Sequence, residues 1–451
     1  MPALDSASSA DSPSPSAASH RRDRAVRLTV AASFGGKALS VACTLAQVPI
    51  ALHYLGREAY GLWMTLVGVT LLINFVDFGI GVGMQQAMAH AYGRDDAQGV
   101  RQAFFTGAYV LTGIAVLVLA AGVPVALLAD WADPLKVHDL ELRREAGRAL
   151  AITVAACAFG IPLNAVARLA AAVQRGWLSA GWIVAGSLTT LAAVIAAAQL
   201  HWGFLGFLAV ATGVPVAQGA GLLLHLGRAL RWPFRLPPPM SRSDIRPMLR
   251  ASLLFAPPQT GLALLQAAPT LVIAHVSGAA AVTAYALLMR LFSPVLQAQI
   301  LILTPVWPAY TEAKVRNDWT WVRRAHRTAL LASAALAVAL GLLAWQSAPL
   351  IHWWVRENDA VPAAALAWLT ASWCALQLAF QPFQYLLVGL GRMRPLAYWG
   401  TAGPAAALFG MLALGRYFGT EGVVAGAVAG LALGGLPGLA VAAERALAKS
   451  P

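Results

Sequence analysis

Apolar stretches long enough to cross a lipid bilayer recur along this chain from about Val26 almost to the C-terminus. A membrane-spanning helix needs about 20 mostly apolar residues, and the gaps between the stretches, about 25 residues at most, leave no room for a separate soluble domain. Of the 451 residues, 59% are hydrophobic and 11% are charged, whereas an average soluble domain is about 25% charged. We therefore predict an all-α polytopic membrane protein of about twelve transmembrane helices.

The expected spans are 28–50, 59–83, 102–129, 148–172, 177–199, 203–226, 252–275, 282–309, 328–351, 362–386, 396–418 and 421–443. The net charge of +13 would also suit a nucleic-acid-binding protein, so the placement of the basic residues matters. Loops on one side hold 23 of the 32 Lys and Arg residues and loops on the other hold 7, while Lys37 and Arg290 lie inside spans. Cytoplasmic loops carry the Lys and Arg excess. We expect both termini in the cytoplasm, a multi-pass location in the cell inner membrane, and no nucleic-acid partner.

The three cysteines, Cys43, Cys157 and Cys374, lie in different spans and form no metal-binding or disulfide spacing. We therefore expect no metal site and no cofactor. A tail rich in Ser, Ala and Pro precedes the first span and is typical of disordered segments.

Short motifs recur in the same order in the two halves of the chain. The pairs are Ala59-Tyr60-Gly61-Leu62 with Ala284-Tyr285-Ala286-Leu287, Gln174-Arg175-Gly176 with Gly391-Arg392-Met393, and Gly203-Phe204-Leu205-Gly206 with Gly419-Thr420-Glu421-Gly422. Their similar offsets, 225, 217 and 216 residues, indicate two six-helix lobes related by an axis along the membrane normal, with substrate between them. The expected organisation is a disordered cytoplasmic tail at 1–27, lobes at 28–226 and 252–443, a basic cytoplasmic linker at 227–251, and a cytoplasmic tail at 444–451.

Polar residues follow one helical face in four of the expected spans. The stripes are Ser33, Lys37, Ser40, Thr44 and Gln47 in span 1; Ser252, Gln259, Gln266 and Thr270 in span 7; Thr283, Arg290, Ser293, Gln297 and Thr304 in span 8; and Gln377, Gln381 and Gln384 in span 10. Such faces avoid lipid because an unsatisfied polar group there costs several kcal/mol. Two interpretations stay open: hydrogen bonds that tie helices together, or a hydrated cavity between the lobes.

The candidate lumen residues are Lys37, Arg290, Gln47, Gln259, Gln266, Gln297, Gln377 and Gln381. A charge near the centre of a span costs at least about 2.5–3.5 kcal/mol, so Lys37 and Arg290 need a purpose. A structural ion pair is one alternative, with Asp77 as the partner of Lys37; Asp77 could instead couple transport to an ion. Because acids are scarce in the spans, a cavity here would be cationic. Cations suit phosphate or diphosphate, and Gln, Ser and Thr suit sugar hydroxyls.

The segment Tyr54-Leu55-Gly56-Arg57-Glu58-Ala59-Tyr60-Gly61-Leu62-Trp63, followed by Asp77-Phe78-Gly79-Ile80-Gly81 and Ala91-Tyr92-Gly93-Arg94-Asp95, resembles polysaccharide and O-antigen flippases. These belong to the multidrug/oligosaccharidyl-lipid/polysaccharide (MOP) exporter superfamily. The likeness is strongest over about residues 30–110. It implies a MATE-like pair of six-helix lobes, alternating access, and an undecaprenyl-diphosphate-linked oligosaccharide of O-antigen, capsule or exopolysaccharide as cargo. Lys37 and Arg290 match the cationic lumen of related flippases by type and approximate location.

The leading hypothesis is a flippase that is not an enzyme, with the lipid bilayer and a lipid-linked oligosaccharide as partners and a glycan polymerase and glycosyltransferases as further candidates. A multidrug or cation antiporter of the same superfamily is the alternative, although proton- or sodium-coupled exchange needs embedded carboxylates. A membrane glycan polymerase or ligase is a third hypothesis. Its catalytic residues would belong in the acidic outer loop at about 130–147.

Overall fold

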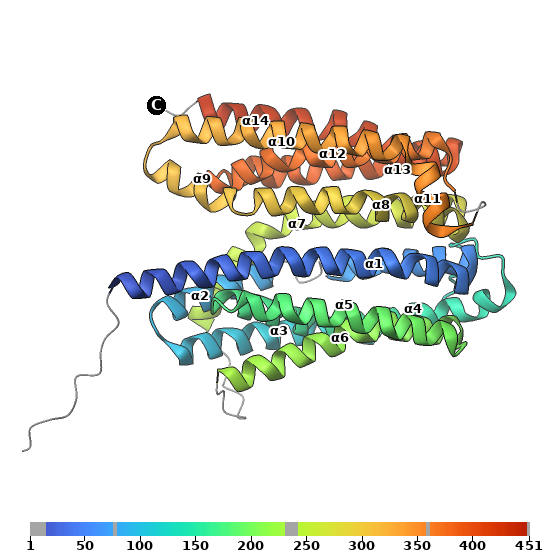
Figure 1. Ribbon diagram of the computed structural model, residues 1–451, viewed down its shortest axis with the longest axis horizontal. Helices are drawn as coiled ribbons and strands as arrows, with labels where there is room; N and C mark the ends of the chain where they lie inside the picture. Colours follow the sequence, from blue (N-terminus) through green and yellow to red (C-terminus); the bar gives the residue numbers. More distant parts are fainter. Residues whose placement is uncertain (1–14, 75–78, 231–241, 358–360, 449–451) are drawn as a thin grey trace, which may run out of the picture.

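The computed structural model describes residues 15–74, 79–230, 242–357 and 361–448. The regular elements of these residues are all α-helices, and the long ones run along the length of one bundle (Figure 1). The helices are α1 (Pro15–Asn74), α2 (Ile80–Gly93), α3 (Ala97–Leu128), α4 (Leu140–Ala172), α5 (Gly176–Gln199), α6 (Gly203–Ala229), α7 (Arg242–Ser277), α8 (Ala279–Leu303), α9 (Val306–Val315), α10 (Trp319–Trp345), α11 (Ser347–Val355), α12 (Ala364–Gly389), α13 (Met393–Gly434) and α14 (Leu436–Ala448).

Two of the helices, α1 and α13, each contain two passages that meet at a glycine. Gly56 has φ 75° and ψ 172°, and Gly419 has φ 59° and ψ −139°, a backbone that glycine adopts without the steric cost of a Cβ atom. We count α1 and α13 as two passages each, and we join the short helices α2, α9, α11 and α14 to the passages that they continue. The described chain then has twelve passages. Nine described stretches are apolar and long enough to cross a membrane, and two of these contain the kinks. The predicted all-α multi-pass architecture is confirmed.

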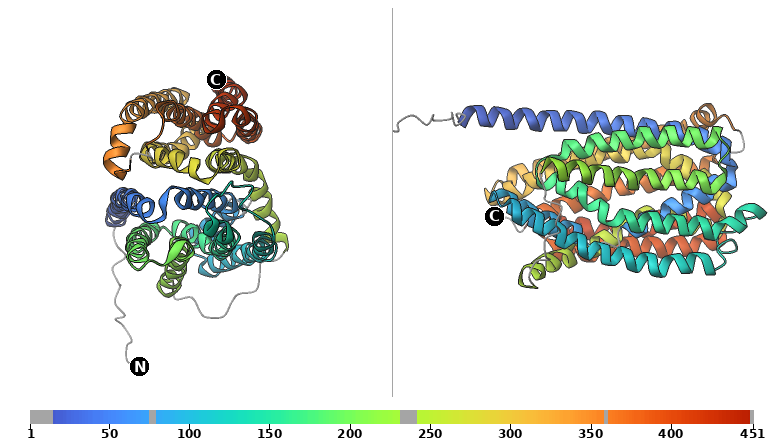
Figure 2. Two further views of the ribbon diagram at one scale, coloured as in Figure 1. Left: turned by 90° about the vertical axis from the view of Figure 1, so that its right-hand side faces the viewer. Right: turned by 90° about the horizontal axis from the view of Figure 1, so that it is seen from below.

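The helices form two groups that lie side by side. α1–α6, the first half, lie on one side of the bundle, and α7–α14, the second half, lie on the other (Figures 1 and 2). Within the first half α3 packs on α4, α1 on α5 and α4 on α6; within the second half α7 packs on α13 and α10 on α12. Between the halves, α1 packs against α7 and α8, and α2 packs against α7.

The connections between helices repeat from one half to the other. Residues with positive φ pair across the halves at offsets of 216–222 residues: Gly56 with Gly278, Asp95 with Asn317, Lys136 with Arg356, Gln174 with Gly391, and Gly203 with Gly419. The helix caps repeat too, because Asp96 accepts a hydrogen bond from the Gly99 backbone N–H (2.7 Å) and Asp318 accepts one from Trp321 (3.0 Å). These pairs give the faint sequence repeat a structural counterpart.

Several helices extend beyond the expected boundaries of the spans into segments that the sequence assigns to tails and linker. α1 begins at Pro15, inside the expected tail 1–27; α7 begins at Arg242, inside the expected linker 227–251; and α14 reaches Ala448, inside the expected tail 444–451. The rest of those segments, 1–14, 231–241 and 449–451, lies outside the described residues. Apolar windows find only the lipid-facing part of a helix, whereas Ala, Leu and Arg favour helix well beyond it.

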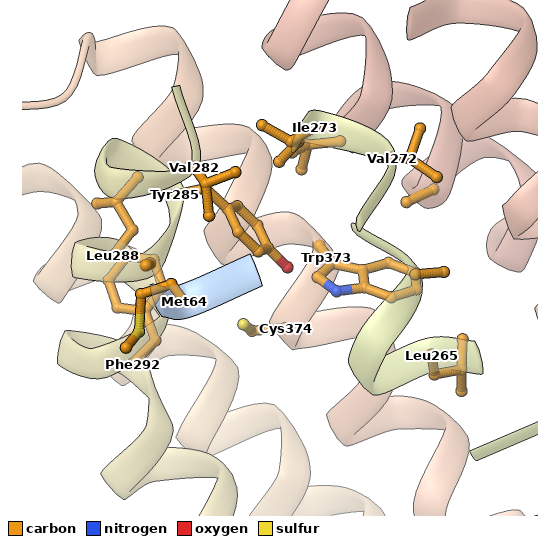
Figure 3. Packing of buried hydrophobic residues seen from close by; sticks show 14 of the residues in the cluster. Met64, Leu265, Val272, Ile273, Val282, Tyr285, Leu288, Phe292, Trp373 and Cys374 are labelled. Atoms are coloured by element: carbon orange, nitrogen blue, oxygen red, sulfur yellow. The ribbon is translucent and has the colours of Figure 1, made fainter. Parts of the chain in front are cut away.

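A buried apolar cluster joins the halves. Tyr285 and Phe292 of α8 are 2% and 0% exposed, and Trp373 of α12 is 0% exposed. The close-up shows the Tyr285 ring directed towards the Trp373 indole, with Met64 of α1 beside α8 (Figure 3). Close packing of this kind supplies most of the attraction between helices in a membrane, where lipid is as apolar as the side chains. The cluster therefore fixes α8 between α1 and α12.

Candidate functional site

A cavity of about 490 Å³ separates α1 from α8, with α5 forming a third wall. The α1 wall carries Lys37, Ser40 and Thr44, and the α8 wall carries Arg290, Ser293 and Gln297. Each set is spaced three and four residues apart, so its members share one helical face. Two of the predicted stripes therefore face the same space from opposite halves of the molecule.

A second cavity, of about 350 Å³, lies mainly within the first half. It shares Thr44 and Arg290 with the cavity between α1 and α8, and it includes Gln47 of the α1 stripe. Apart from Arg290, its lining carries these hydroxyl and amide side chains: Thr44, Gln47, Thr70, Asn164, Ser187, Thr190, Thr212 and Gln218. The site as a whole is thus a cationic region at α1 and α8 that adjoins a neutral, hydrogen-bonding region among α1, α4, α5 and α6.

Lys37 and Arg290 are the charged residues of the first lining and Arg290 is the charged residue of the second, and no described Asp or Glu belongs to either lining. Among the described residues neither cation has an ion-pair partner. The Arg290 guanidinium lies 3.9 Å from the Met64 sulfur and close to the Tyr60 hydroxyl. Asp77, the expected partner of Lys37, lies outside the described residues. Arg290 lies about 16 Å along α8 from Ala279, too deep for its head group to reach the interface by extending along the helix.

Four of the predicted lumen residues do not line these cavities. Gln259 and Gln266 of α7 and Gln377 and Gln381 of α12 are absent from both linings. Gln377 is 9% exposed and packs inside the second half, whereas Gln266 lies on an exposed face. These two cavities are lined by α1, α4, α5, α6 and α8, and the assignment of the glutamines of spans 7 and 10 to a lumen stays a prediction.

The α12 region illustrates the other interpretation of polar residues in spans. Gln299 of α8 is buried and donates hydrogen bonds to the Ser333 hydroxyl (2.7 Å) and to the Leu378 carbonyl (2.6 Å). Side chains that bridge helices in this way tie them together. Periodic spacing identifies a shared face, but it does not distinguish a face towards water from a face towards another helix.

The lining of the second cavity was missed in the sequence. Asn164, Thr212 and Gln218 lie in spans 4 and 6, and Ser187 with Thr190 lies in span 5. Each of these spans contributes one or two polar groups to the lining, too few to form a stripe of its own. A weaker signal was present, because Thr212 and Gln218 flank Pro215 at three-residue spacing and all three line the cavity.

Hydrogen bonds between the halves gather at one end of the bundle, around Gly56, Lys136 and Gly278, which we call the closed end. The Thr283 hydroxyl donates to the Arg57 carbonyl (2.6 Å), and the Ala279 N–H donates to the Leu135 carbonyl (3.1 Å). The Lys136 ammonium donates to the Val276 carbonyl (2.5 Å). The main cavity extends instead towards Gly176, the first residue of α5, at the opposite end.

Comparisons with known proteins agree with this architecture. The family model described as "Polysaccharide biosynthesis protein" matches residues 34–313. No curated protein matches the chain in sequence.

The solved structures that resemble the chain include one described as the inward-facing conformation of a multidrug resistance MATE family transporter of the MOP superfamily. It is 14% identical, with a TM-score of 0.74, over 91% of this chain and 96% of that one. An outward-facing conformation of such a transporter is 18% identical over 94% and 95% of the two chains, with a TM-score of 0.63. At these identities the likeness shows a MATE-like fold.

A third structure is a MOP superfamily transporter from Pyrococcus furiosus Vc1 (DSM3638). Its description says that reverse polarity of the binding pocket suggests a different function. It is 18% identical over 94% of this chain and 96% of that one, with a TM-score of 0.66.

Proposed function

Because the chain belongs to the polysaccharide biosynthesis protein family, we propose that its cargo is an oligosaccharide linked to undecaprenyl diphosphate, which it carries across the inner membrane by alternating access. The chain belongs to this family and has a MATE-like multi-pass fold, and we propose that it is a transporter of the MOP superfamily and not an enzyme. The cargo is proposed as a repeat unit of O-antigen, capsule or exopolysaccharide.

The pairing of Lys37 with Arg290 in a cavity to which no described residue contributes a carboxylate carries this proposal. An anion must release its hydration shell to enter the membrane, and fixed cations offset that cost. A diphosphate has several oxygens that accept charge-assisted hydrogen bonds, and guanidinium and ammonium groups supply matching donors. Two cations from opposite halves could hold one diphosphate between them.

The neutral cavity beside them suits the glycan. Sugars present many hydroxyls, each of which both donates and accepts, so amide and hydroxyl side chains are complementary to them. Asn164 and Gln218 offer amides, and Thr70, Thr190 and Thr212 offer hydroxyls, without a charge that would favour one ionic cargo. We propose that the first sugars enter this region while the lipid tail stays in the bilayer.

The polarity of the cavity argues against the drug or cation antiporter. Cationic cargo and coupling ions are held by embedded carboxylates, whereas both linings carry cations and neutral groups. For the Pyrococcus furiosus transporter, reverse polarity of the binding pocket is said to suggest a different function. We extend that argument to this chain.

We propose that the two lobes, 28–226 and 252–443, rock against each other about the closed end, and that the structure is the inward-facing state. The Lys and Arg distribution predicts that the closed end faces the periplasm. The higher TM-score to an inward-facing structure (0.74) than to an outward-facing one (0.63) supports this assignment. Cargo that binds one state better than the other would shift the population between them.

The test is export of the glycan by cells that carry Lys37→Ala together with Arg290→Ala. We expect export to be lost while the amount of protein in the membrane is retained, because neither cation forms an ion pair with an acid among the described residues. The matched control is Arg323→Ala with Arg416→Ala, which removes two exposed arginines far from both linings. Export at the level of the control would contradict the proposal.

A further inference from the structure

A groove of about 520 Å³ lies between the beginning of α13 and α14, at the end of the bundle opposite the closed end. Arg392 and Arg445 line it together with an apolar surface from Pro395, Trp399 and Val441. Arg392 immediately precedes α13, and Arg445 lies in the last turn of α14. Two helices therefore bring one arginine each to the same apolar groove.

The two arginine side chains are exposed and available. Neither makes a hydrogen bond or an ion pair with any other residue in the part of the chain that the structure describes. No Asp or Glu is among the described residues that line the groove. The groove is therefore cationic at the two arginines and apolar along the rest of its length.

The floor of the groove depends on a close approach of α13 to α14. A Cβ atom at Gly438 would lie 2.4 Å from the Trp399 indole, a distance that real Cβ atoms essentially never show. The absence of a side chain at Gly438 is what allows the indole to lie flat against α14. Trp399 and Gly438 thus form a rigid apolar surface between the arginines and the middle of the bundle.

The same four residues occur in the first half, each 217 positions earlier. Arg175, Trp182, Gly221 and Arg228 correspond to Arg392, Trp399, Gly438 and Arg445. A Cβ atom at Gly221 would likewise lie 2.3 Å from the Trp182 indole. Four matches at one offset, including the glycine–indole contact, show that the arrangement belongs to the repeated fold and is not a chance grouping.

The first-half copy is occupied by contacts of its own. Arg175 donates to the Ala229 carbonyl (3.4 Å), and the Trp182 indole N–H donates to the His225 imidazole (3.3 Å). The residue that corresponds to His225 in the second half is Ala442, which lines the groove. In the first half the His225 imidazole fills the space beside the indole. In the second half the small Ala442 side chain leaves that space open.

We propose that the α13–α14 groove binds an anionic phospholipid, with its phosphate between Arg392 and Arg445 and an acyl chain along Trp399 and Val441. Arginine forms strong, geometrically matched hydrogen bonds with phosphate. Basic pockets between membrane helices at the cytoplasmic side bind anionic head groups, and the predicted topology places the groove on that side. The site is separate from the Lys37–Arg290 cavity and does not depend on the transported cargo.

The test is native mass spectrometry of the full-length purified protein titrated with phosphatidylglycerol or with phosphatidylcholine. Arg392→Gln with Arg445→Gln should weaken phosphatidylglycerol binding about 25-fold, since each basic residue near a membrane surface contributes about a factor of five. The matched control, Arg323→Gln with Arg394→Gln, removes two exposed arginines from the same end but outside the groove. Equal binding by the two double variants would overturn the proposal, as would equal binding of the two lipids by the wild type.

A second variant tests the groove without removing charge. Ala442→His places in the second half the imidazole found in the first, and it should lower phosphatidylglycerol binding although both arginines remain. Competition with inorganic phosphate at millimolar concentration shows whether the groove binds the whole lipid or only a phosphate group. Phosphatidylglycerol that stays bound in the presence of phosphate supports the proposal. Displacement of the lipid by phosphate would contradict it, as would unchanged phosphatidylglycerol binding by Ala442→His.

Discussion

Replacing Thr283 with Val should make the cavity accessible from the closed end. Thr283 is fully buried, and its hydroxyl donates a 2.6 Å hydrogen bond to the Arg57 carbonyl of the other half. Valine keeps the shape of the side chain but leaves that carbonyl unsatisfied, which costs about 1–3 kcal/mol. The cost falls on the closed state alone, because the carbonyl meets water once the halves separate there. The population open at this end should rise about 5- to 150-fold.

The assay is the rate at which a membrane-impermeant maleimide, added from the closed side, labels a cysteine placed at Gln47. Gln47 lines the second cavity, and the buried native cysteines Cys43, Cys157 and Cys374 would be replaced by Ala beforehand. When opening is rare, the labelling rate is proportional to the open population. The rate should therefore increase by the same factor as that population.

Thr65→Val is the matched control. Thr65 is 1% exposed, and its hydroxyl donates to the Gly61 carbonyl (2.9 Å) within the same helix, so its loss affects open and closed states equally. It should not change the labelling rate. If Thr283→Val labelled no faster than Thr65→Val, the closed end would not be held by contacts between the halves, and the reasoning would be refuted.

Two further predictions concern the second cavity and the first kink. Asn164→Leu with Gln218→Leu should lower glycan transport at least tenfold, because the amides are assigned to the sugars. The same double variant should bind undecaprenyl diphosphate alone as well as the wild type does. A loss of that binding, measured with the purified protein, would contradict the assignment. Gly56→Ala should lower the free energy of unfolding by about 1–3 kcal/mol, because φ is 75° and ψ is 172° there, a backbone conformation found essentially only at glycine, although no atom lies within 4 Å of an added Cβ atom. The control, Gly35→Ala, is equally open but helical and should not destabilise; equal denaturant midpoints for the two variants would argue against strain at Gly56.

The residues of the cationic cavity could be predicted from spacing because several polar residues, one of them a cation, fall on one face of each helix. Lys37, Ser40 and Thr44 form one face of a helix, as do Arg290 and Ser293, and a cation in the middle of a span limits what that face can contact. The glutamines of spans 7 and 10 have the same periodicity without a charge. A neutral amide satisfies its hydrogen bonds against another helix as well as in water, so spacing alone could not assign Gln259 or Gln377 to a cavity.

The repeat of the fold was also visible in the sequence, but its geometry was not. Lys136 and Arg356 adopt positive φ at equivalent turns, although neither is a residue type that favours this conformation. Their backbone is set by the helices on either side, which are determined by packing over the whole bundle. The same holds for the α13–α14 groove, which depends on Trp399 reaching Gly438 from a different helix.

Binding of undecaprenyl-diphosphate-linked oligosaccharide to the purified protein, compared between wild type and Lys37→Ala with Arg290→Ala, tests the central claim most directly. The cationic cavity predicts that removing both cations weakens binding at least a hundredfold, since a charge-assisted hydrogen bond contributes about 1.5–3 kcal/mol. It also predicts that salt weakens binding to the wild type more than to the variant. Equal affinities for the two proteins would contradict the assignment of this cavity to the diphosphate.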